Sequence, residues 1–443
     1  MTAEANGTAR PLSRRAKGAL AAIVVLYAGL AVLYSYATRF RYGPDEPAHF
    51  VYIQSVALDH RLPALRDDNV YLPGAAISHQ RQQPPLYYTL GALVYRALGR
   101  LPADGIWRVL RFFSIAIGLA VLALQWRLLR LLFPDSEGLC LAGLAVLAFL
   151  PMFTYITSVV NNDPLAVLLF TGVVYQWCRM LAGRSSLADV ALAGGLVGLA
   201  VLTKESALAL VPGLLIAAAA TGTATGAAPA RRIGRAALAL GTAGLVCGGW
   251  FLHNLSAYGS PTVYFYDRPF YTGLRDALTH PMGTSDRPGL VAVLGLTAER
   301  TLLFLWVPWW ATGGRIPKAP YLVGLGLVSL AVLMGLALGW VDRRRGRPGL
   351  TASQSHGLAL MLLTVGVLAA GILRYVLFVD YTALQAGRYF VVMWPAMAVL
   401  SVSGLATLMV TARAKAIGLA ALVGVWLAGN VAVLWLVRLW YHT

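Results

Sequence analysis

Apolar residues occur in long runs along this chain, separated by short polar segments. The first run covers about residues 18–38. Later runs of roughly spanning length lie near 107–132, 138–158, 164–182, 187–203, 205–222, 236–253, 320–340, 356–379, 389–411 and 415–437. Because about 20 apolar residues in a helix cross the hydrocarbon core of a bilayer, the pattern predicts an all-α, polytopic membrane protein with about eleven transmembrane helices.

Basic residues give these spans an orientation. They occur in the polar tail 1–17 and after several later runs, at Arg127, Arg130, Arg179, Arg184, Arg231, Arg232, Arg235, Arg343, Arg344, Arg345, Arg347, Arg413 and Lys415. If all of them are cytoplasmic, as the positive-inside rule requires, the spans alternate consistently. We therefore expect a cytoplasmic N-terminal tail (1–17), a transmembrane domain (18–437) and a short external tail (438–443).

The same alternation leaves two long segments outside, at about 39–106 and 254–319. In the first, the apolar run after Pro84-Pro85 must begin and end outside. It is therefore predicted to be a juxtamembrane helix in the outer interface, which suits its tyrosines. In the second, the apolar stretch 290–310 is interrupted by Glu299-Arg300 and is also predicted to be interfacial. If that stretch crossed the membrane, every later span would have the opposite orientation.

Composition agrees with a membrane protein and narrows its partners. The chain is 58% hydrophobic and 12% charged, whereas soluble domains carry about 25% charged residues. Its net charge of +18 is attributed to basic residues that flank apolar runs, so membrane lipids are expected as partners and nucleic acid is not. The three cysteines lie inside apolar runs and imply no disulfide framework. The first apolar run shows no clear cleavage site, so no cleavable signal peptide is expected.

An adjacent acidic pair, Asp45-Glu46, follows the first apolar run closely. Acidic residues are scarce, 18 in 443, and charges near a bilayer are costly unless they serve a function. Pro47 predicts a helix that begins here and runs to about Leu58, which puts both carboxylates at its N-terminus, with His49 one turn further. Carboxylates there could accept a proton from a hydroxyl or hold a divalent cation. A helix cap is the alternative.

Two further polar groups are predicted at the outer ends of spans. Asp163 ends the sequence Asn161-Asn162-Asp163 before Pro164, and it suits either a catalytic or metal-binding role or a simple N-cap. Lys204 lies in a charged break between two apolar runs. It could receive a phosphate as a point charge, or it could extend to the interface beside Glu205.

A third group lies at the outer start of a late span. Arg388 occurs in Gln385-Ala-Gly387-Arg388-Tyr389. A guanidinium suits phosphate oxygens, and Gly387 would allow a close approach; an interfacial anchor is the alternative. Carboxylates and cations on one outer face favour a reaction on a phosphorylated substrate that is presented from the membrane.

The order of these motifs resembles the GT-C superfamily of integral-membrane glycosyltransferases. It comprises an acidic pair after the first span, a Pro-Pro element before an external helix, an Asn-x-Asp span start, a Thr-Lys break and a late Gly-Arg-Tyr. Members include protein O-mannosyltransferases and aminoarabinose transferases of lipid A. The sequence Pro-Asp-Glu-Pro-Ala-His-Phe looks closest to a bacterial branch whose substrates are largely undefined. The resemblance covers about residues 20–410.

The resemblance implies roles for particular residues. Asp45, with Glu46 beside it, and Asp163 would be the catalytic acids. Asp45 and Asp163 would share a divalent cation such as Mg, Mn or Zn, if the chain uses one. Substrate-binding residues would be His49, Gln83, Lys204, Arg388 and Tyr389. Many relatives have His or Lys where this chain has Gln83. Unlike relatives with a large C-terminal soluble domain, this chain is expected to lack one after the spans.

The resemblance also implies an activity. We expect a glycosyltransferase of the cytoplasmic membrane, with its active site outside, that transfers a sugar with inversion from a polyprenyl-phosphate donor. The acceptor would be a hydroxyl of a glycan, lipid or protein. Two alternatives stay open: a polysaccharide ligase or polymerase acting on pyrophosphate-linked glycans, in which arginine leads catalysis, and a transporter or flippase of lipid-linked sugars.

Overall fold

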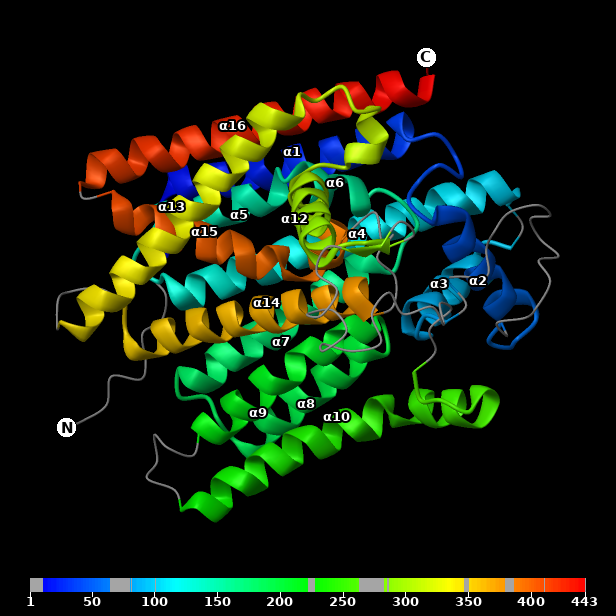
Figure 1. Cartoon of the computed structure of the whole chain (residues 1–443), viewed down its shortest axis with the longest axis horizontal. Helices are drawn as coiled ribbons and strands as arrows, with labels where there is room; N and C mark the ends of the chain where they lie inside the picture. Colours follow the sequence, from blue (N-terminus) through cyan, green and yellow to red (C-terminus); the bar gives the residue numbers. More distant parts are fainter. Residues whose placement is uncertain are drawn as a thin grey trace.

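Long helices run side by side through a computed structural model of the chain (Figure 1). The structure describes residues 11–63, 80, 82–99, 101–221, 228–262, 283–284, 287–345, 350–378, 386–409 and 411–442. Within them, eight helices are long and apolar enough to cross a membrane: α1 (Arg14–Ala37), α4 (Ala103–Leu132), α7 (Asp163–Leu181), α10 (Pro229–Tyr258), α13 (Lys318–Arg344), α14 (Ala352–Phe378), η4 with α15 (Ala386–Met393, Trp394–Leu408) and α16 (Ala412–His442). This confirms the polytopic, all-α membrane class.

Three shorter apolar segments coincide with the remaining predicted spans. They are α5 (Glu137–Ala148), α8 (Leu187–Val201), and η2 (Glu205–Leu210) continued by α9 (Val211–Ala220). The predicted span 138–158 is broken at Pro151 into α5 and α6 (Pro151–Ile156), because proline cannot donate the helical hydrogen bond and clashes with the preceding turn. The count of eleven spans stays a prediction.

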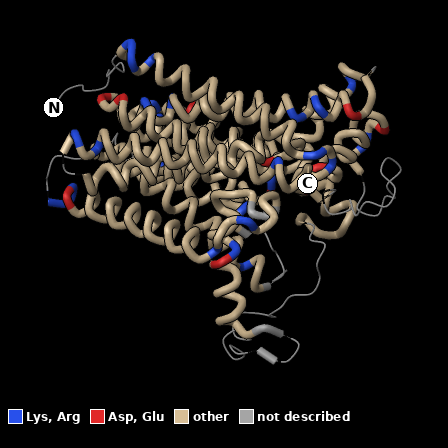
Figure 2. Tube along the Cα trace, turned by 90° about the horizontal axis from the view of Figure 1, so that it is seen from above, with Lys and Arg blue, Asp and Glu red and all other residues tan. Residues whose placement is uncertain are grey.

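The first and last long helices give the bundle two distinguishable ends. In Figure 1, α1 begins at one end of the bundle, the N-terminal end, and α16 ends at the other. The α13–α14 and α15–α16 connections lie at the N-terminal end, whereas α2 and α3 lie at the other end, which we call the α2–α3 end. Charged residues gather toward the ends of the long helices and leave the middle nearly uncharged (Figure 2).

The predicted external helices form a small layer of their own. The helices α2 (Glu46–Leu58) and α3 (Leu86–Ala97) pack on each other. Their buried side chains, with the start of α4, make a hydrophobic cluster separate from the main core. The expected helix after Pro84-Pro85 is therefore present, and at 12 residues it is too short for the roughly 20 that a span needs.

The second predicted external region is described only in part. It contains two short antiparallel strands, β1 (Gly283–Thr284) and β2 (Arg287–Pro288), then α12 (Leu290–Trp306) and η3 (Trp309–Thr312). Residues 263–282 of this region lie outside the described residues. The helix α12 runs across the direction of the long helices (Figure 1) and is not among the candidate spans, in keeping with the predicted interfacial placement.

Candidate functional site

Four charged side chains from four parts of the chain meet at the α2–α3 end. Arg388 of η4 donates from Nη1 to Oδ2 of Asp45, just before α2, at 2.8 Å. It also donates from Nε to Oδ2 of Asp163, at the start of α7, at 3.3 Å. Lys204, between α8 and η2, donates from Nζ to Oδ1 of Asp163. The structure thus joins four predicted site residues in one network, which we call the Arg388 network.

The members of the Arg388 network differ in exposure. The side chain of Asp163 is fully buried, while those of Arg388 and Lys204 are 8% and 12% exposed. The Asp45 side chain is 34% exposed, so it is the most accessible of the four. Two carboxylates and two cations balance formally, which limits the cost of placing them in a largely buried site. An incoming group would therefore reach Asp45 first.

The backbone at Asp45 is left-handed, with φ 56°. This conformation costs a residue other than glycine about 1–2 kcal/mol, and such residues concentrate at functional sites. Asp45 precedes α2 but makes no side-chain cap hydrogen bond, so the capping alternative does not hold. Its carboxylate is instead committed to Arg388.

Glu46, although adjacent, is enclosed in a different set of contacts. Its side chain is fully buried and makes a bidentate pair with Arg111 of α4, Nε to Oε1 at 2.7 Å and Nη2 to Oε2 at 2.6 Å. The backbone N–H groups of Val160 and Gly43 also donate to it. A Cβ on Gly43 would lie 2.9 Å from Oε2, so glycine allows this close approach. Glu46 therefore ties α2 to α4 and to the segment before α7.

Arg111 is the partner of Glu46, and we call these two residues the Glu46–Arg111 pair. Besides Glu46, it donates to the carbonyls of Ser35, Thr38 and Arg39 at the end of α1. Arg111 was not among the predicted site residues. The available signal was a charge within an apolar run, which is typical of a functional or structural buried pair.

His49 lies one turn into α2 and is buried, 1% exposed. Its Nδ1 is 2.9 Å from the Tyr88 hydroxyl of α3, and Tyr88 also stacks on Tyr52 at 3.7 Å between ring centroids. Burial lowers the pKa of His49 to about 3, although the nearby Asp45 carboxylate acts to raise it. The imidazole is therefore neutral at physiological pH.

Amide side chains join the loops that carry the site. Asn162 donates to Oε1 of Gln83 at 3.3 Å and to the carbonyl of Thr203, next to Lys204, at 3.2 Å. Asn161 donates to the carbonyl of Pro44, next to Asp45, at 3.2 Å. The Asn-Asn dipeptide before Asp163 thus links the segments that carry the network, and Gln83 lies at its edge.

The contacts of Lys204 and Asp163 differ from those of an interfacial lysine beside Glu205 and of a helix N-cap. Lys204 pairs with Asp163, while Glu205 instead accepts a hydrogen bond from Trp250 at 3.4 Å. Asp163 is the first residue of α7, and its preceding N-cap residue makes no side-chain cap. The ring of Tyr389 lies 5.9 Å from Lys204 Nζ. Asp163 is therefore not a helix N-cap, and Lys204 does not pair with Glu205 at the interface.

Gly387 serves a contact other than the predicted one. A Cβ there would lie 2.2 Å from the carbonyl oxygen of Thr301 and 2.6 Å from the amide nitrogen of Leu305, both on α12. The glycine therefore lets η4 pack closely on α12 and so places Arg388. Gln385, which precedes this motif, lies outside the described residues.

The residues fit a divalent cation poorly. The predicted ligands, Asp45 and Asp163, are both paired with Arg388, and Lys204 takes the other oxygen of Asp163. Across the described ranges, no group of three or more His, Cys, Asp or Glu side chains could hold a metal ion. The divalent cation predicted at Asp45 and Asp163 stays a prediction.

Comparison with known proteins places the fold. Residues 82–243 match the sequence model of the dolichyl-phosphate-mannose-protein mannosyltransferase family, a segment that includes Gln83, Asp163 and Lys204. No curated protein matches the chain in sequence. The fold is similar to the oligosaccharyltransferase AglB of Archaeoglobus fulgidus, at 12% identity and TM-score 0.51, over 96% of this chain and 55% of that one.

Two other solved structures are also similar to the chain. The same archaeal enzyme with an inhibitory peptide and dolichol-phosphate matches at 11% identity and TM-score 0.51, over 97% of this chain and 55% of that chain. ArnT from Cupriavidus metallidurans bound to undecaprenyl phosphate matches at 16% identity and TM-score 0.46, over 94% of this chain and 74% of that chain. The chain thus spans about half the length of the archaeal enzyme.

Proposed function

We propose that this chain, with its GT-C glycosyltransferase fold and the mannosyltransferase-family match over 82–243, is a membrane glycosyltransferase. It transfers a sugar from a polyprenyl-phosphate donor to an acceptor hydroxyl of a glycan, lipid or protein. The observation that carries the proposal is the Arg388 network at one end of a membrane-spanning bundle. In it the partly exposed Asp45 carboxylate pairs with Arg388, and the buried Asp163 pairs with both Arg388 and Lys204. Dolichol-phosphate in the similar archaeal structure supports the donor class.

Lys204 and Arg388 supply the charge that a lipid-linked phosphate needs. Arg388 presents a planar fork that matches phosphate oxygens, and Lys204 presents a compact point charge. Asp163 holds both cations in place through its two oxygens. Fixed cations aimed at a leaving phosphate stabilise the charge that develops in the transition state, typically the largest catalytic contribution.

Asp45 acts as the general base. It accepts the proton of the acceptor hydroxyl while the acceptor oxygen forms a bond to the anomeric carbon of the sugar. The bond from that carbon to the phosphate oxygen breaks, and the phosphate leaves with the electron pair against Arg388 and Lys204. A single displacement inverts the anomeric configuration.

Glu46 and Gln83 are positioning residues in this proposal. Glu46 is enclosed by Arg111 and two backbone N–H groups, so it fixes the turn that carries Asp45. Gln83 accepts from Asn162 and sets the edge of the site. Tyr389 faces Lys204 and helps to hold its ammonium group. We place the protein in the cytoplasmic membrane with this end outside, because the basic loops lie at the other end.

Transfer activity tests the proposal directly. The protein is reconstituted in liposomes with undecaprenyl-phosphate-linked monosaccharides and membrane extract as the acceptor source. We expect Asp45→Asn to lower the rate by about 10²- to 10⁴-fold, the usual contribution of general acid–base catalysis. Asp104→Asn is the matched control, because Asp104 is an exposed carboxylate in the first turn of α4 at the same end.

The outcome also separates the alternatives. Activity of Asp45→Asn close to wild type would contradict the mechanism. If Arg388→Ala alone abolished transfer from a pyrophosphate-linked glycan while Asp45→Asn was mild, a ligase or polymerase would be favoured. Movement of the lipid-linked sugar across the liposome bilayer without any transfer product would favour a flippase.

A further inference from the structure

One buried polar atom beside the Arg388 network has no partner among the described residues. It is Nε2 of His49. The imidazole is 1% exposed, and it belongs to the first turn of α2, directly after Asp45 of the proposed reaction centre. A buried hydrogen-bonding group without a partner destabilises the folded state, and each such group calls for an explanation.

The hydrogen bond on the other ring nitrogen decides what Nε2 can do. Burial raises the pKa of Tyr88, so its hydroxyl keeps its proton and needs an acceptor. The nitrogen Nδ1 of His49, at 2.9 Å, is the acceptor that the structure provides. If Nδ1 instead carried the proton, both the Tyr88 hydroxyl proton and the Nε2 lone pair would be without partners. The favoured tautomer therefore carries its proton on Nε2, where it is a donor.

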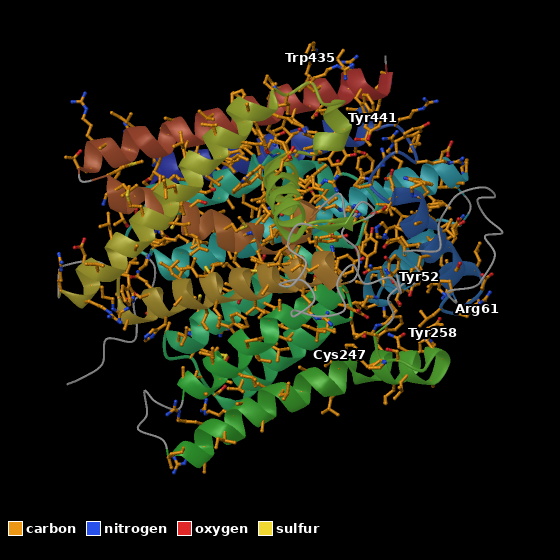
Figure 3. The ribbon with its side chains drawn as sticks, in the orientation of Figure 1. Tyr52, Arg61, Cys247, Tyr258, Trp435 and Tyr441 are labelled. Atoms are coloured by element: carbon orange, nitrogen blue, oxygen red, sulfur yellow. The ribbon has the colours of Figure 1, made fainter. Side chains whose placement is uncertain are left out.

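The position of this donor is fixed by packing. The His49 and Tyr88 rings are nearly parallel, with centroids 5.8 Å apart at 15°, and Tyr52 stacks on Tyr88 with centroids 3.7 Å apart at 7°. The Tyr52 hydroxyl is tied to the carbonyl of Gln83 at 3.1 Å. Figure 3 shows Tyr52 on α2 at the same end of the molecule as Tyr441 and Tyr258. A donor held this rigidly can discriminate between ligands that place an oxygen there and ligands that do not.

We propose that Nε2–H of His49 donates a hydrogen bond to a hydroxyl of the sugar that is transferred, which makes His49 a specificity-determining residue. This rests on the proposed function. The phosphate is assigned to Lys204 and Arg388, whose cationic donors suit it better than a neutral imidazole. The backbone N–H of His49 donates to the Asp45 carbonyl at 3.1 Å, so His49 lies one helical turn from Asp45, on the side of the site where the sugar and the acceptor hydroxyl meet.

The test compares donors that differ by one hydroxyl. A panel of undecaprenyl-phosphate-linked monosaccharides first identifies the sugar that the wild-type protein transfers. Monodeoxy versions of that donor are then given to wild type and to His49→Phe, which keeps a flat ring but lacks the donor. We expect His49→Phe to lower kcat/KM for the parent donor by about 10- to 100-fold, as for a lost hydrogen bond to a buried polar group. One monodeoxy donor should be used equally by both proteins.

Two further measurements separate recognition from a structural role. Binding of bare undecaprenyl phosphate should be unchanged in His49→Phe, because no sugar is present. Tyr88→Phe keeps His49 but removes the partner of Nδ1, so we expect a smaller loss, confined to donors that retain the contacted hydroxyl. Equal losses for every monodeoxy donor in both variants, or weaker binding of bare undecaprenyl phosphate, would overturn the inference.

The same experiment distinguishes this inference from the proposed function. Wild type that transfers sugar normally, with His49→Phe identical to it on all donors, would reject the role of His49 and leave the proposed function intact. Wild type that transfers no sugar from any donor of the panel would reject the proposed function, and the inference with it.

Discussion

Two adjacent carboxylates belong to networks of opposite character. The carboxylate of Glu46 is fully buried, and its oxygens accept from Arg111 and two backbone N–H groups. That of Asp45 is 34% exposed and shares Arg388 with Asp163. A closed, fully satisfied pair holds elements together, whereas an accessible carboxylate on a shared cation can exchange partners with a substrate. Because Asp45 and Glu46 carry the same functional group, their different surroundings decide which of them can react with a substrate.

The largest expected effect concerns the closed pair. Glu46→Gln should lower the free energy of unfolding by about 3–5 kcal/mol, because it leaves the Arg111 charge buried without its counter-ion. Chemical unfolding in detergent, followed by tryptophan fluorescence, measures the change. The double variant Glu46→Met with Arg111→Met should recover much of that loss, since no charge then remains buried. Stability of Glu46→Gln equal to that of Asp45→Asn would remove the distinction between the two carboxylates.

A smaller effect is expected at the shared cation. Arg388→Lys keeps the charge but loses the fork that contacts Asp45 and Asp163 at once. We expect transfer to fall about 10- to 100-fold, the equivalent of one charge-assisted hydrogen bond of about 1.5–3 kcal/mol. Initial transfer rates in liposomes measure it. Lys318→Arg is the control, because Lys318 forms an exposed ion pair with Glu299. A variant as active as wild type would show that the fork is dispensable.

His49, near both networks, should make stability depend on pH. Its pKa is lowered to about 3 in the folded protein, from about 6.5 when unfolded. The unfolded state therefore takes up a proton first, and the folded state loses stability as pH falls from about 6.5 toward 3, by about 1.4 kcal/mol per pH unit at most. Thermal unfolding between pH 7 and 4.5 should show a smaller drop in Tm for His49→Phe than for wild type. Parallel drops would contradict a buried neutral imidazole.

The smallest effect is expected from metal removal. Because Arg388 and Lys204 already pair with the carboxylates that a cation would use, dialysis against EDTA should leave the transfer rate unchanged. Rates before and after addition of Mg, Mn or Zn measure this. A loss on chelation that one of these ions restores would show that a cation displaces the arginine during turnover.

The sequence predicted the architecture well because each signal was local. Long apolar runs indicated the spans, and Pro47 marked the start of α2, which begins at Glu46. The run after Pro85 indicated a short helix, which is α3, whereas its external placement stays a prediction. The break at Pro151 was missed, because the run 138–158 is apolar throughout and its length suggested one span.

The site was predicted as a set of residues but not as a set of contacts. Asp45 and Arg388 are 343 positions apart, and no local pattern indicates that they form an ion pair. Glu46 and Asp45 were indistinguishable in sequence, since only the packing of α4 places Arg111 on one of them. Gly387 was expected beside a phosphate, yet it contacts the backbone of α12, a contact between distant segments.

Binding of undecaprenyl phosphate tests most directly whether substrate and Asp45 share Arg388. Affinity is measured in nanodiscs for wild type, Asp45→Asn and Arg388→Ala. Because Asp45 competes for the guanidinium, Asp45→Asn should bind the lipid phosphate as tightly as wild type or more tightly, while Arg388→Ala should bind it at least about 10-fold more weakly. Equal weakening in both variants would contradict the exchange of partners at Arg388, and with it the assignment of Asp45 as the base of an open site.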